Sequence, residues 1–172
     1  MSKIGIIGGS GLDDPDILEG SSETSIKTPY GDPSSKIKEG KIEGQHVAIL
    51  SRHGIYHSIL PTKVNFRANI WALKKIGCTH ILASTAVGSL RKAIEPGHIV
   101  FPDQFIDFTK QRISTFYDED KVVHTPMAEP FCQSTIEILR ETATEMSIPN
   151  PVSYTHLRAH ETKEDGGCRR MG

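Results

Sequence analysis

Short runs of hydrophobic residues, each ending at a glycine or a polar residue, recur along this chain. Runs of this length that are rich in isoleucine, leucine and valine predict buried strands of a parallel sheet. We expect such strands over residues 4–7, 46–51 and 80–84, and a strand followed by a loop within residues 99–108.

Two further segments have the apolar spacing of helices. The first is predicted over Pro61–Ile76, because proline stands near its start, two lysines lie in its last turn and Gly77 follows it. Its expected inward positions are Val64, Ala68, Trp71, Leu73 and Ile76. The second opens at residues 134–137, Ser-Thr-Ile-Glu, which have the spacing of a capping box. Its expected core positions are Ile136, Leu139, Ala143 and Met146.

The alternation of strands and helices predicts a doubly wound α/β sheet with short connections. The polar run Glu19–Lys27 is interpreted as a solvated connection between elements.

A glycine-rich turn follows the first predicted strand. Glycines with bare amide groups, together with the hydroxyl of Ser10, suit a loop that cradles an anion. Asp14 stands where the dinucleotide-binding fingerprint needs glycine, and no Gly-Lys-Ser/Thr follows, so a dinucleotide or a nucleoside triphosphate is disfavoured. A tight turn without a ligand is the alternative interpretation.

Polar side chains also follow the second and third predicted strands. Arg52 and His53 come directly after one strand, and Thr85 follows the other. Ligands of open α/β sheets bind outside the carboxyl ends of the strands, so these groups and Ser10 are expected to converge on one oxyanion, most simply phosphate. Each of these residues also has an ordinary structural interpretation. Arg52 could lie on a solvated rim, His53 in a capped loop and Thr85 within a strand.

Several longer motifs occur together in order, and the chain from Lys3 to Ser147 resembles the methylthioadenosine branch of the purine nucleoside phosphorylase family. The motifs are IGIIGGSGLDD, TPYGDPSS, LSRHGIYHSILPTKVNFRANIWALK, STAVGSL, PDQFIDFTKQR and HTPMAEPFC. The resemblance implies a three-layer α/β fold with a mostly parallel central sheet, incomplete here at its C-terminus.

The resemblance also implies roles for individual residues. Phosphate would be bound by Ser10, Arg52, His53, Thr85 and the backbone of Ala86, and Arg52 and His53 would act in catalysis.

Two further histidines are candidate substrate or interface residues, His57 from its place in the loop before Pro61 and His124 from the same resemblance. His57 would contact the ribose side of the substrate, and a metal pair with His53 is the weaker alternative. His124 would reach the substrate of a neighbouring subunit in a homotrimer, although an ordinary loop histidine is equally compatible with the sequence.

The implied activity is a glycosyl transfer in methionine and purine salvage. Phosphate would attack the ribosyl carbon of S-methyl-5'-thioadenosine, giving adenine and 5-methylthioribose 1-phosphate, without a metal or an organic cofactor. The alternatives are another nucleoside phosphorylase acting on methylthioinosine or purine nucleosides, and an inactive phosphate-binding fragment. An NAD-dependent redox enzyme is disfavoured by Asp14.

Residues 1–150 are expected to form the N-terminal part of a nucleoside phosphorylase domain, and residues 151–172 a non-native tail. Val152–Thr162 resembles a translated sequencing adapter, and the tail has neither strand nor helix periodicity. The aspartate that neutralises the departing base in the family is not found, so the truncated chain is expected to be inactive and poorly soluble. His156, His160 and Cys168 lack a fourth ligand for zinc.

Composition adds little but agrees with a reducing cytoplasm. The 172 residues carry a net charge of −1, which gives no electrostatic case for nucleic acid or an anionic membrane. No apolar stretch is long enough to span a bilayer, no signal peptide is recognised, and the three cysteines disfavour a disulfide framework.

Overall fold

The computed structural model describes residues 2–9, 17–109, 112–117, 121–151 and 157–159, the last three by their backbone alone. It divides into two compact units, Met1–Val87 and Gly88–Gly172.

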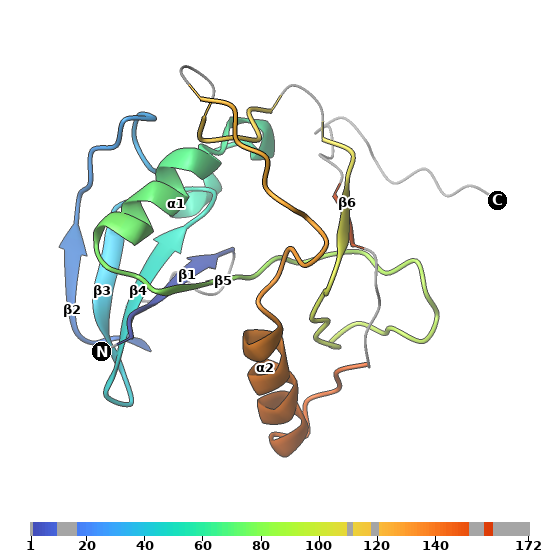
Figure 1. Ribbon diagram of the computed structural model, residues 1–172. Helices are drawn as coiled ribbons and strands as arrows, with labels where there is room; N and C mark the ends of the chain where they lie inside the picture. The colour runs from blue at the N-terminus through green and yellow to red at the C-terminus, as the bar shows by residue number, and fades with distance from the viewer. Residues whose placement is uncertain (1, 10–16, 110–111, 118–120, 152–156, 160–172) are drawn as a thin grey trace. The chain divides into compact units, whose positions relative to one another are not determined.

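A five-stranded mixed sheet forms the first unit, in the order β2-β3-β4-β1-β5 (Figure 1). The strands are β1 (Ile4–Gly8), β2 (Glu19–Thr24), β3 (Ile37–Ile42), β4 (Gln45–Ser51) and β5 (His80–Ala83). Strand β1 pairs in parallel with both β4 and β5, whereas β3 pairs antiparallel with β2 and β4. The three strands predicted from the apolar runs are therefore confirmed, and they form the parallel part of the sheet. The expected burial holds for β1 and β4 but is wrong for β5, in which three of four residues are exposed.

Strands β3 and β4 are joined by a tight hairpin at Glu43 and Gly44. Both residues have positive φ, 47° and 79°. A two-residue turn with positive φ at both positions matches the right-handed twist of the flanking strands, and it sets the register in which Ile42 faces Gln45.

The sheet separates two apolar clusters, because neighbouring residues of β4 point to opposite faces. Ala48 and Leu50 pack with Ile7, Ile37, Ala72 and Leu73, and this cluster includes residues of helix α1 (Phe66–Lys75). On the other face, Val47 and Ile49 pack with Leu18. Leu50, Ala48 and Leu73 are fully buried, so α1 and β4 form the centre of the first unit.

Helix α1 is shorter than predicted. Pro61 begins a separate 3-10 turn, Pro61–Lys63, and Val64 then adopts an extended conformation that interrupts the helix. The α-helix starts after Asn65, whose side chain accepts a hydrogen bond from the Ala68 amide at 3.1 Å. Of the predicted inward residues, Val64, Ala68 and Leu73 are buried, and Trp71 and Ile76 are half-buried.

The end of α1 was correctly predicted from Gly77. This residue has φ of 90°, which glycine adopts without strain. Its amide donates to the Lys74 carbonyl, and the Cys78 amide donates to the Leu73 carbonyl, both at 3.0 Å. These two bonds satisfy the last carbonyls of the helix in a Schellman motif and lead directly into β5.

The interpretation of Glu19–Lys27 as a solvated connection was wrong, because Glu19–Thr24 forms β2. Five of its six residues are exposed, so nothing in their hydrophobicity marks a strand. The strand exists because β3 offers a free edge with which its backbone pairs, and the pairing is irregular between Glu19 and Ser22.

The second unit contains strand β6 (Phe105–Asp107), helix α2 (Gln133–Glu145) and strand β7 (Leu157–Ala159). The strand predicted within residues 99–108 is thus only three residues long. Helix α2 is confirmed, but the capping box is not: the N-cap is Cys132, without a side-chain capping bond. Ile136 and Ala143 are buried as expected, Leu139 is half-buried, and Met146 is 65% exposed.

Strand β7 pairs in parallel with β6 and lies in the range 151–172, where no element was predicted. Most of that range falls outside the described residues, including His156 within the adapter-like segment, His160 and Cys168. The division of the chain near residue 150 remains a prediction.

Within the described residues, no helix is long and apolar enough to cross a membrane, and the cysteines there, Cys78 and Cys132, are free thiols.

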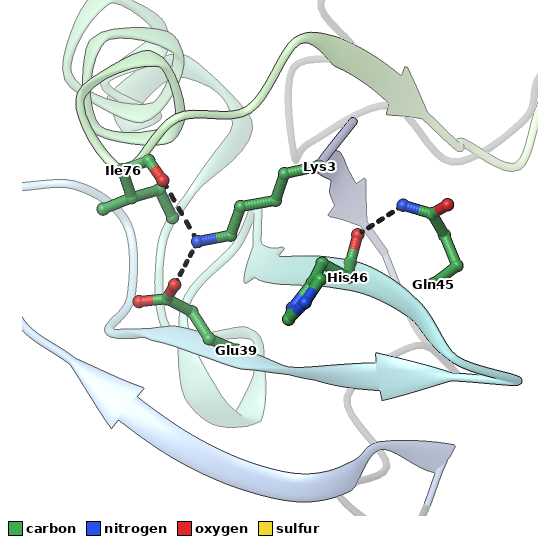
Figure 2. A network of polar contacts seen from close by, with 5 residues as sticks. All are labelled: Lys3, Glu39, Gln45, His46 and Ile76. Atoms are coloured by element: carbon green, nitrogen blue, oxygen red, sulfur yellow. Dashed lines mark hydrogen bonds and ion pairs between the residues drawn. The ribbon is translucent and has the colours of Figure 1, made fainter. Parts of the chain in front are cut away.

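An ion pair links Lys3, just before β1, to Glu39 of β3. Figure 2 shows the Lys3 ammonium between the Glu39 carboxylate and the Ile76 carbonyl, to which it donates at 3.1 Å. Burial of Glu39 raises its pKa, but hydrogen bonds from Lys3 and Thr24 and the charge of Lys3 outweigh burial, so the pKa lies below its ordinary value of 4.5. Lys3 therefore joins the sheet to the end of α1 on the side where the parallel strands begin.

We expect this pair to make folding stability depend on pH in the acidic range. A carboxylate with a lowered pKa stabilises the folded state fully above its ordinary pKa, and the contribution is lost as the pH falls through the lowered value. Glu39→Gln should cost on the order of 1 kcal/mol in the free energy of unfolding at pH 7, and the difference from wild type should shrink below about pH 4.5. Urea unfolding at several pH values measures this.

Glu23→Gln is the matched control, because Glu23 pairs with Lys36 on the surface, where their side chains are 47% and 59% exposed. A Glu39→Gln difference that stays constant down to pH 3 would contradict the ion-pair account.

Candidate functional site

Parallel pairing brings the carboxyl ends of β1, β4 and β5 to one edge of the sheet. The Arg52 amide, just beyond β4, donates to the Gly8 carbonyl at 3.0 Å, and the Ser84 amide, just beyond β5, donates to the Ile7 carbonyl at 3.1 Å. The hydrogen-bond pattern of the sheet therefore continues for one residue beyond β4 and β5, and it fixes the first residue of each following loop.

Arg52 spans this edge with its guanidinium. Its Nη1 donates to the Ser84 carbonyl at 2.7 Å and its Nη2 to the Thr85 hydroxyl at 3.2 Å. Partial burial lowers the pKa of Arg52, yet arginine remains charged at neutral pH. A half-buried positive charge thus lies between the ends of β4 and β5.

His53 continues the contacts of Arg52. Its Nε2 accepts from the Arg52 Nε at 3.3 Å, and its Nδ1 lies 3.1 Å from the Ile59 carbonyl. Because a carbonyl can only accept, these contacts assign the proton of the neutral ring to Nδ1. The Ile59 amide also donates to the His53 carbonyl at 2.9 Å, so the loop holds both the backbone and the ring of His53.

The ring of His57 stacks on that of His53, with the centroids 5.7 Å apart and the planes 17° from parallel. His57 is the last residue of the 3-10 turn Ile55–His57, in which Tyr56 and His57 have positive φ, so the segment is not a regular helix. Among the described residues, no group of three or more potential metal ligands is found. The predicted contact of His57 with the ribose remains a prediction.

Gly9 follows β1 directly, and its lack of a side chain lets the backbone lie close to the Arg52 guanidinium. A β-carbon built on Gly9 would lie 3.3 Å from the Arg52 Nη2. The sequence pattern marks the glycines of this turn for their anion-facing amides, but it does not reveal this second reason for a side-chain-free position.

The structure thus brings together Arg52, His53 and Thr85, as predicted, and Ala86 follows Thr85 in the same loop. Ser10 lies outside the described residues, although Gly8 and Gly9 before it reach this edge. His124 is exposed in the second unit. The roles assigned to Ser10, Ala86 and His124 remain predictions.

The grouped side chains are chemically suited to an oxyanion. A guanidinium offers a planar set of N–H donors that matches the oxygens of a phosphate, and the hydroxyl of Thr85 can donate to the same ligand. In this structure the donors of Arg52 are used by Ser84, Thr85 and His53, so an arriving anion would exchange with contacts that already orient the guanidinium.

A sequence profile described as the Phosphorylase superfamily matches residues 3–158. The chain belongs to the phosphorylase superfamily. Two relatives of this phosphorylase-superfamily chain are named S-methyl-5'-thioadenosine phosphorylase. The protein from Danio rerio is 57% identical over 151 residues, and the one from Aedes aegypti is 55% identical over 150 residues.

Both alignments cover 85% of this chain and 54% of the relative. The phosphorylase-superfamily chain therefore spans about half the length of the curated relatives it matches.

Solved structures of methylthioadenosine phosphorylase from Schistosoma mansoni have the same fold. The ligand-free structure has a TM-score of 0.80 at 46% identity, over 86% of this chain and 54% of that chain. A complex with adenine has the same TM-score and identity and is covered to 53%. These matches confirm the phosphorylase-type α/β fold predicted from the sequence.

We expect Gly9→Ala to weaken phosphate binding without unfolding the protein. The added methyl group would displace the Arg52 Nη2, the movable end of a long side chain, so the effect falls on the orientation of the guanidinium. Phosphate affinity measured by calorimetry should fall roughly fivefold, the effect of misaligning one charge-assisted hydrogen bond. Unchanged affinity would show that the close approach of Gly9 to Arg52 has no part in binding.

Proposed function

We propose that this chain carries the phosphate-binding half of the active site of an S-methyl-5'-thioadenosine phosphorylase. The observation that supports this most is the Arg52 guanidinium held between the ends of β4 and β5, beside Thr85 and His53. The names of the relatives from Danio rerio and Aedes aegypti support the substrate.

In the proposed reaction, an oxygen of phosphate forms a bond to C1' of the ribosyl group while the bond from C1' to the purine nitrogen breaks. The electron pair of that bond leaves with the purine, which takes up a proton to become adenine. Arg52 would hold the phosphate beneath the sugar, where its negative charge stabilises the positive charge that develops at C1'. His53, whose ring is fixed by Ile59, would orient the phosphate through Arg52.

We assign the complete reaction to a protein of the relatives' full length, and phosphate binding to this chain. This assignment follows from the 54% coverage of the relatives and from the missing base-protonating aspartate expected from the resemblance. An inactive phosphate-binding fragment is the second candidate function, favoured by the same coverage.

We further propose that the longer protein is a cytoplasmic homotrimer that uses no metal or organic cofactor. In this trimer His124 would reach the substrate of the adjacent subunit, and His57 would contact its own ribose. Mixing an inactive Arg52→Ala protein with an inactive His124→Ala protein tests the shared site, since mixed trimers should regain part of the activity.

Arg52→Ala should abolish most phosphate binding by this chain. Removing the charged donor group should weaken affinity roughly 100-fold, whereas Ser10→Ala, which removes one neutral hydroxyl, should weaken it roughly fivefold. Isothermal titration with inorganic phosphate measures both. Lys75→Ala is the control, because it removes a positive charge from the last turn of α1 and should leave affinity unchanged. Equal losses in Arg52→Ala and Ser10→Ala would contradict the assigned roles.

Turnover of three nucleosides by the full-length protein decides the substrate. We expect phosphate-dependent cleavage of methylthioadenosine to exceed that of methylthioinosine and inosine, with release of adenine followed by absorbance or chromatography. A preference for inosine would assign the protein to another branch of the superfamily.

A further inference from the structure

The backbone just before Arg52 is held from both sides of β4. On one side the Arg52 amide donates to the Gly8 carbonyl of β1 at 3.0 Å. On the other side the Ser51 amide donates to the Ser35 hydroxyl at 3.0 Å. Successive amides of a strand point to opposite sides within the sheet, so these two bonds together fix the direction in which the chain leaves β4.

Ser35 replaces a strand partner at this position. Strand β3 begins at Ile37, which faces Leu50, so its ladder ends one residue short of Ser51. The Ser35 hydroxyl donates to the Lys36 carbonyl at 2.8 Å and is thereby oriented to accept from the Ser51 amide. The Ser35 hydroxyl oxygen thus gives β4 one further hydrogen bond at its carboxyl end, which is the end nearest the candidate site.

The segment that carries Ser35 is anchored on α1. The Ser34 amide donates to the Asn69 Oδ1 at 2.8 Å, and the Asn69 Nδ2 donates to the Ser34 hydroxyl at 2.9 Å. Asn69 is fully buried, so its amide group has little freedom to move. One turn earlier on the same helix face, the Asn65 Nδ2 donates to the Tyr30 carbonyl at 2.7 Å.

We propose that Ser35 is a positioning residue for phosphate binding, which fixes the carboxyl end of β4 and thereby the aim of the Arg52 guanidinium. The proposal rests on the proposed function, because it takes Arg52 to be the phosphate ligand. Phosphate binding by a guanidinium depends steeply on the orientation of the guanidinium. Arg52 directs Nη1 and Nη2 toward the residues that follow β5, and Ser35 holds the backbone from which the Arg52 side chain extends.

Phosphate titration of the full chain tests the proposal with Ser35→Ala, Ser35→Thr and the control Ser22→Ala, which removes an exposed hydroxyl from β2. Circular dichroism first establishes a temperature at which each variant is folded. Ser35→Ala should weaken phosphate affinity roughly fivefold, the effect of one lost hydrogen bond, and Ser35→Thr should restore it because the hydroxyl is kept. Ser22→Ala should bind as wild type does.

Ser35→Ala that binds phosphate as tightly as wild type while folded would overturn the proposal and leave Ser35 a purely structural residue. Should Ser35→Ala fail to fold, Ser35→Cys takes its place in the titration. The thiol keeps the size of the side chain but accepts only weakly, so phosphate affinity is again expected to fall below that of wild type.

An NMR signature separates positioning from general destabilisation. The Arg52 Nε–H resonance should shift in Ser35→Ala, whereas the indole resonance of Trp71 on α1 should not. Absence of an Arg52 shift would also overturn the proposal. Wild-type chain that binds no phosphate would instead overturn the proposed function, so the two failures are distinguishable.

Discussion

Parallel pairing of β1 with β4 on one side and β5 on the other is the constraint on which the candidate site depends. It aligns Gly8 with Ser51 and Ile7 with Ala83, so that three loops leave the sheet at one edge. The ladder bonds from Arg52 to Gly8 and from Ser84 to Ile7 carry this alignment into the loops. Without it, Arg52 could not contact both Ser84 and Thr85, which lie more than thirty residues further along the chain.

The contacts of Arg52 hold its guanidinium in place at the candidate site. A free arginine side chain would lose much rotational freedom on binding, whereas here Ser84, Thr85 and His53 already restrict the guanidinium. These neutral partners can be exchanged for a charged oxygen, which is the stronger acceptor. At the opposite edge, Lys3 joins Glu39 to the end of α1, so the two ends of the parallel strands carry separate charged contacts (Figure 2).

Apolar runs predicted β1 and β4 because these strands contribute buried side chains to the core, and they predicted β5 although three of its four residues are exposed. The rule for ligands at strand ends then placed Arg52, His53 and Thr85 together. The pattern failed where tertiary pairing decides the structure. Strand β2 is polar and forms because β3 offers it an edge. Helix α1 starts at Phe66, after the N-cap Asn65, rather than at Pro61, because Val64 is extended. The links from Asn69 through Ser34 and Ser35 to Ser51 join residues far apart in sequence, so no local pattern could reveal them.

Our main hypothesis is that inorganic phosphate binds at the carboxyl ends of β1, β4 and β5. Phosphate titration of isotopically labelled chain, followed residue by residue by NMR, tests it most directly. We expect saturable shifts at Gly8, Gly9, the Arg52 side chain, Thr85 and Ala86, with Lys3 and Glu39 unaffected. Shifts spread over exposed lysines without saturation, or none at the Arg52 side chain, would contradict it.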